Sequence, residues 1–139
     1  MPNLTQAKDW IAYAQRDYDL AKTIEQTTWP RFLEGICYHS QQATEKALKA
    51  VLAYQNTRIP KTHDILELFE KIEPIAPSVI FDERIADKIT NYAIANRYPN
   101  HPFDLTESDA TLALKYARET IAAVERFVGL DSNERYEHG

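Results

Sequence analysis

Two residues in the second half of the chain, Arg97 and His101, have side-chain types that can bind an anion and transfer a proton. A guanidinium stays charged and can hold a phosphate through two parallel hydrogen bonds. An imidazole can accept or donate a proton near neutral pH. Only Tyr98, Pro99 and Asn100 separate the two residues, so both belong to one short segment. The pair could therefore bind a phosphate and move a proton.

A second group of polar side chains recurs at helical spacing. One face holds His39, Gln42, Lys46 and Lys49, and a neighbouring ridge holds Gln41 and Glu45. A solvated helix face is one interpretation, because such faces are usually rich in lysine and glutamate. A binding face is the other, because histidine and paired glutamines are more specific hydrogen-bonding types. Small residues on the same helix would also let another helix approach closely: Ser40, Ala43, Ala47 and Ala50.

The overall charge counts against bulk, non-specific binding to nucleic acid. The chain has a net charge of −5 and a pI near 5.4. A local basic site is not excluded, because the charged residues from position 46 to 62 are all cations: Lys46, Lys49, Arg58 and Lys61. A solvated helix end followed by a loop would give the same pattern, and both interpretations stay open.

Composition indicates one soluble helical domain. With 139 residues and three glycines the chain suits a single helical core, which we expect over residues 1–130, followed by a polar tail at 131–139. The single Cys37 lies in an apolar arc, which is typical of a core thiol, and favours a reducing compartment. No signal peptide or membrane span is visible, so we expect a cytoplasmic protein. The histidines show no ligand-pair spacing, so we expect no metal and no cofactor.

The seven prolines divide the chain into helix-sized blocks. Apolar periodicity predicts helices at 4–26, 30–55, 63–72 and 82–97, with Pro30 opening the second and Thr62 capping the third. A capping-box pattern at Thr106 to Asp109 predicts a fifth helix, and Gly129 is a fitting end for it. The expected architecture is an all-α, up-and-down bundle of about five helices.

Four motifs in order resemble the HEPN family, the higher-eukaryote and prokaryote nucleotide-binding domains. The strongest is Ser40-Gln41-Gln42-Ala43-Thr44-Glu45-Lys46-Ala47-Leu48-Lys49-Ala50, which is similar to the family's second-helix signature. The others are Ala14-Gln15-Arg16-Asp17-Tyr18, Lys61-Thr62-His63-Asp64-Ile65 and Asn96-Arg97-Tyr98-Pro99. Together they span residues 14 to 99, so the chain is identified as a member of this family.

The resemblance implies a bundle that commonly forms a homodimer and is often encoded beside a minimal nucleotidyltransferase, as toxin and antitoxin. It also implies metal-independent RNA cleavage by an arginine and a histidine separated by four to six residues. Arg97 and His101 match that pair with three intervening residues, one fewer than the family pattern. Pro99 and Pro102 keep His101 out of a continuous helix. Where family members that are neutralised by adenylylation carry a tyrosine, this chain has Phe103.

Three functions therefore remain open: a ribonuclease toxin, a non-catalytic module that binds a nucleotide, RNA or a nucleotidyltransferase, and a purely structural homodimer. The catalytic candidates are Arg97 and His101, and the binding candidates are Asp17, His39, Gln42, Lys46, Lys49, Lys61, His63 and Tyr98. Structural roles compete at some positions. Arg97 could pair with Asp17 or with the last carbonyls of its helix, His101 could be an exposed loop residue, and His63 could be a first-turn residue.

Overall fold

Five α-helices and one short 3₁₀ helix form the described part of the chain. The computed structural model describes residues 1–97 and 105–130, without the side chains of residues 93–97. The elements are α1 (Leu4–Thr28), α2 (Leu33–Tyr54), α3 (Ile65–Ile72), η1 (Pro77–Val79), α4 (Glu83–Arg97) and α5 (Glu107–Val128). The predicted all-α class is confirmed, since no strand occurs in these ranges. The predicted tail at 131–139 lies outside the described residues.

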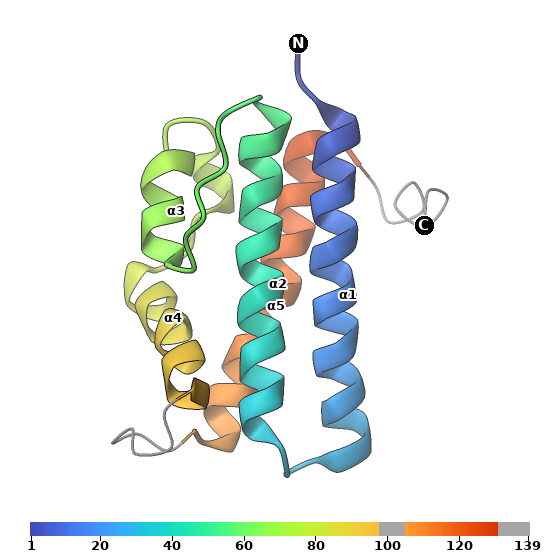
Figure 1. Cartoon of the computed structure of the whole chain (residues 1–139), viewed down its shortest axis with the longest axis vertical. Helices are drawn as coiled ribbons and strands as arrows, with labels where there is room; N and C mark the ends of the chain where they lie inside the picture. The colour runs from blue at the N-terminus through green and yellow to red at the C-terminus, as the bar shows by residue number, and fades with distance from the viewer. Residues whose placement is uncertain (98–104, 131–139) are drawn as a thin grey trace.

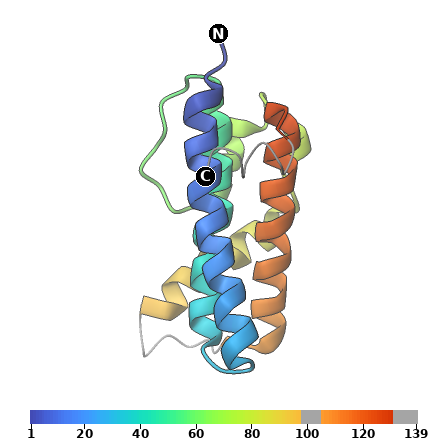
Figure 2. The same ribbon diagram turned by 90° about the vertical axis from the view of Figure 1, so that its right-hand side faces the viewer.

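The long helix α2 is the centre of the bundle. It packs against α1, α3, α4 and α5, and Figure 1 shows α1, α2 and α5 as three long upright helices with α3 and α4 beside them. The connection at 55–64 runs back down beside α2 before α3 begins (Figure 1), and it stands off to the side of α1 and α2 in Figure 2. This return brings His63 back to the middle of α2.

The small residues predicted to admit another helix are used inside the bundle. Ser40, Ala43, Ala47 and Ala50 are all fully buried within this single chain. Small side chains allow neighbouring helices to approach closely, and the helices that surround α2 belong to the same chain. These small residues are therefore explained by packing within one chain, without a second copy of the protein.

The start of α2 differs from the prediction. The sequence predicts that Pro30 opens this helix, whereas α2 begins at Leu33 and Phe32 is 53% exposed. Phe32 adopts a left-handed conformation, with φ at 56°, and its carbonyl accepts the first hydrogen bonds of the helix from Gly35 and Ile36. Pro30 lies in the preceding turn because α1 continues to Thr28, where Trp29 N–H still bonds the Glu25 carbonyl.

The start of α3 also differs. The predicted cap is Thr62, but Asp64 caps the helix, because its carboxylate accepts a hydrogen bond from the Leu66 N–H at 3.0 Å. Thr62 instead stabilises the segment that leads into α3, because its hydroxyl accepts a hydrogen bond from the Asp64 N–H at 3.1 Å and donates one to Glu67 at 2.6 Å. His63 consequently lies before the helix, and its predicted place in the first turn is wrong.

The predicted ends of α5 are confirmed. Thr106 Oγ1 accepts from the Asp109 N–H at 3.1 Å, while the Asp109 carboxylate accepts from the Thr106 N–H at 2.9 Å. This reciprocal pair is a complete capping box. Gly129 ends the helix with φ at 80°, a conformation that glycine adopts without steric cost.

Candidate functional site

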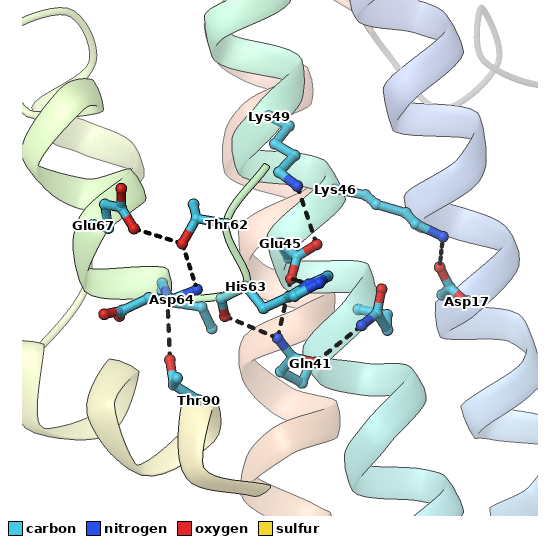
Figure 3. Close-up of polar contacts among 12 residues, drawn as sticks. Asp17, Gln41, Glu45, Lys46, Lys49, Thr62, His63, Asp64, Glu67 and Thr90 are labelled. Carbon is cyan, nitrogen blue, oxygen red and sulfur yellow. Dashed lines mark hydrogen bonds and ion pairs between the residues drawn. The ribbon is translucent and has the colours of Figure 1, made fainter. Parts of the chain in front are cut away.

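A buried carboxylate, Glu45, is the centre of a polar group that we call the inner cluster: Gln41, Glu45, Lys49 and His63. Glu45 is 2% exposed, and its Oε1 lies 2.9 Å from His63 Nδ1 while its Oε2 lies 3.3 Å from Lys49 Nζ. Gln41 donates to Glu45 Oε1 and to the His63 carbonyl, both at 3.3 Å. Figure 3 shows these contacts joining α2 to the segment before α3.

The inner cluster combines three residues of α2 with one residue of the 55–64 connection. Gln41, Glu45 and Lys49 follow one another at four-residue intervals, so they share a face of α2. His63 comes from the 55–64 connection, eighteen positions from Glu45, and is held there by the Gln41 bond to its carbonyl. The Ile65 N–H bonds Thr90 Oγ1 of α4 at 3.2 Å, which fixes the far side of the same turn.

The solvated-face interpretation is wrong for Gln41, Glu45 and Lys49. Gln41 is fully buried and Lys49 is only 7% exposed. A buried charge needs a paired, hydrogen-bonded partner, and here Glu45 and Lys49 supply one another. By contrast, the His63 side chain is 59% exposed, so its ring meets solvent while Nδ1 contacts a buried carboxylate. The contact with Glu45 therefore fixes one nitrogen of a ring that is otherwise largely exposed.

Asp17, His39 and Lys46 form an outer cluster between α1 and α2. Lys46 Nζ lies 2.5 Å from Asp17 Oδ2, and Figure 3 shows this bond crossing between the two helices. His39 Nδ1 lies 3.6 Å from Asp17 Oδ1, which is too long for a hydrogen bond. Predicted candidates from two helices are thus brought together. Asp17 pairs with Lys46, which was not predicted, and the side chain of Arg97, the partner that was predicted, lies outside the described residues.

Two predicted binding residues take no part in the ion pairs of the two clusters. Gln42 is half-buried, and its amide donates a long hydrogen bond of 3.4 Å to Gln41 at the edge of the inner cluster. Lys61 is exposed and lines a hollow formed with α3, apart from both clusters. Lys46 and Lys49 already contact carboxylates, so the stretch predicted to be purely basic is neutralised over its helical half.

A third polar group, which sequence reasoning missed, joins α4 to α5. The buried Tyr92 hydroxyl donates to Asp109 Oδ1 at 3.0 Å, and Lys88 Nζ lies 3.7 Å from the same oxygen. Burial alone would raise the pKa of Asp109, but the hydrogen bonds from Thr106 and Tyr92 and the Lys88 charge lower it below its usual value. Burial and the nearby Asp109 carboxylate raise the pKa of Tyr92. The capping-box pattern marks Asp109, but nothing local marks its partner seventeen positions away.

Cys37 is a core thiol, as predicted. It is fully buried, and burial, with the Asp109 and Glu34 carboxylates, raises its pKa to about 12. We therefore expect the thiol to react with Ellman's reagent at pH 8 at least about 1,000-fold more slowly than in unfolded chain, because almost no thiolate is present. Comparing the rate in buffer with the rate in 6 M guanidinium tests this, and equal rates would contradict a buried thiol.

The predicted catalytic pair falls largely outside the described structure. The backbone of α4 extends to Arg97, but the Arg97 side chain, Tyr98 and His101 lie outside the described residues. Within residues 1–97 and 105–130 no group of three or more His, Cys, Asp or Glu could hold a metal ion. The helices in these ranges are also too short or too polar to cross a membrane.

These features define a small all-helical bundle whose central helix turns charged residues inward. The chain belongs to the HEPN domain family, whose family model matches residues 7–127. The resemblance expected from the four motifs is thereby confirmed.

Two relatives are similar over most of their length. The protein named "Putative toxin MJ1304", from Methanocaldococcus jannaschii, is 28% identical over 148 residues, covering 91% of this chain and 90% of that protein. The crystal structure of TT1696 from Thermus thermophilus is similar with a TM-score of 0.72 and 27% identity. The similarity covers 88% of this chain and 98% of that one.

Proposed function

We propose that this HEPN-family chain is the toxin-type member of a two-component pair, with a minimal nucleotidyltransferase as its partner. The observation that carries the proposal is the similarity, over 91% of the chain, to the protein whose name is "Putative toxin MJ1304".

The proposed activity is metal-independent RNA cleavage at the C-terminal end of α4. Arg97 would hold the phosphodiester and stabilise the charge that develops on the phosphorane. His101 would remove the proton from the 2′-hydroxyl as that oxygen attacks phosphorus, and a protonated histidine would then supply the proton to the departing 5′ oxygen. A two-fold dimer would bring two arginines and two histidines to one cleft, allowing base and acid to act together.

Incubation with RNA in EDTA tests this proposal. We expect the wild-type protein to cleave total tRNA or a defined single strand, and Arg97→Ala and His101→Ala to lose cleavage. Arg84→Ala is the matched control, because Arg84 is an exposed arginine near the opposite end of α4 that pairs only with Asp82 in the described structure. Full activity in Arg97→Ala would remove this arginine from the mechanism.

A non-catalytic binding module is the second candidate. The observation that favours it is the three-residue spacing between Arg97 and His101, with Pro99 inside it. Binding through Lys46 or Lys49 is not part of this candidate, since both ammonium groups contact carboxylates of the bundle. Intact RNA at high protein concentration, together with saturable binding of RNA or of a nucleotidyltransferase, would favour this function over cleavage.

A further inference from the structure

A hollow of about 580 Å³ lies between the 55–64 connection and α3. Its lining residues are Thr57, Arg58, Ile59, Pro60, Lys61, Glu67 and Lys71. Figure 2 shows the connection standing off to the side of α1 and α2, and the lining residues Arg58, Lys61 and Lys71 are exposed. None of the three cations belongs to the inner or outer cluster.

Positive charge dominates the lining, in a chain with a net charge of −5. Arg58, Lys61 and Lys71 are all exposed, and none of them forms an ion pair with the residues that the structure describes. The one carboxylate in the lining, Glu67, accepts a hydrogen bond from the Thr62 hydroxyl at 2.6 Å. Lys46 and Lys49 differ, because bundle carboxylates already neutralise them. Three unpaired cations around one concavity attract an anion.

We propose that this hollow binds the backbone phosphates of a single RNA strand, as a site separate from the end of α4. Arginine and lysine are the usual partners of phosphate oxygens, and the half-buried Ile59 and Pro60 offer an apolar surface against which a sugar or base can pack. The lining contains no aromatic side chain on which bases could stack, so recognition is independent of sequence.

The position of the hollow determines which substrates it serves. The 55–64 connection and α3, which line the hollow, lie in the upper half of Figure 1, whereas α4 ends in the lower half. A strand held at both places must run along the bundle, so the hollow increases the affinity for long strands and not for dinucleotides. This part of the inference rests on the proposed cleavage at Arg97, while phosphate binding itself does not.

The dependence of binding on salt tests the site directly. A fluorescein-labelled 20-nucleotide strand with 2′-O-methyl sugars cannot be cleaved, so its anisotropy in EDTA reports binding alone. For Arg58→Ala/Lys61→Ala/Lys71→Ala we expect at least a tenfold loss of affinity at low salt. The slope of log K against log salt should fall by about 2, since each phosphate contact on a single strand contributes about 0.7.

The matched control is Arg16→Ala/Lys115→Ala/Arg118→Ala. It removes the same charge from exposed positions outside the hollow and should keep the wild-type slope within about 0.5. An equal change in both triple variants, or no detectable binding by the wild-type protein at 50 mM salt, would overturn the proposal. Wild-type binding that the hollow variant loses, combined with no cleavage of ordinary RNA, would reject the proposed ribonuclease and leave the phosphate site standing.

Discussion

Replacing Glu45 with alanine is expected to destabilise the protein by about 3–5 kcal/mol, because the Lys49 ammonium would remain buried without its partner. The same change removes the acceptor for Gln41 and for the His63 ring, so the return of the 55–64 connection to α2 would be weakened. Urea unfolding followed by circular dichroism measures the loss.

Two further variants isolate the cause. Glu70→Ala, an exposed glutamate on α3, should change stability by no more than about 0.5 kcal/mol. Glu45→Ala combined with Lys49→Met should recover a large part of the loss, because no unpaired charge then remains in the core. If Glu45→Ala unfolds at the wild-type urea concentration, the inner cluster does not contribute to stability as its burial indicates.

Replacing Asp109 with alanine is expected to cost about 2–4 kcal/mol. One part is the lost capping box at the start of α5, and the other is the buried Tyr92 hydroxyl left without an acceptor. The control is Glu107→Ala, an exposed carboxylate in the same first turn, which should cost well under half as much. Thermal unfolding of the three proteins at pH 7 gives the comparison.

Acid should remove the advantage of the wild-type protein over Asp109→Ala. The pKa of Asp109 is lowered in the folded protein, so the unfolded chain binds its proton first as the pH falls. The stabilisation by this carboxylate is therefore complete above about pH 5, begins to decline near the unfolded pKa of about 3.9, and is lost as the pH passes through the folded pKa. A stability difference that stays constant from pH 7 to pH 3 would show that ionised Asp109 is not its source.

The sequence predicted helices best where local signals are strong. Periodic apolar residues located all five helices, and the Thr106–Asp109 pattern predicted a capping box that the structure contains. Both signals depend on residues within about four positions of one another. The starts of α2 and α3 were predicted less well. Pro30 and Thr62 are both acceptable residues at a helix start, but in the structure the N-cap residues of α2 and α3 are Phe32 and Asp64.

The candidate site was predicted in part. Sequence placed His39, Gln42, Lys46 and Lys49 on one helix and identified Asp17 and His63 as candidates, but it paired none of these helical residues with its actual partner. The glutamate that holds the inner cluster together, Glu45, was assigned only to a neighbouring ridge. Whether Lys61 binds phosphate, and whether Arg97 and His101 cleave RNA, stay predictions with the tests given above.

By itself, the sequence determined the helical class, the helix ends with strong caps and the family, because each depends on short-range spacing or on motifs in order. Only the tertiary structure decided that Glu45 and Lys49 are buried, that Tyr92 bonds Asp109, and that Arg58 and Lys71 line one hollow. The reason is physical. Spacing places a residue on a face of its own helix, but burial and charge pairing depend on what covers that face. Here α1, α3, α4, α5 and the returning 55–64 connection cover it.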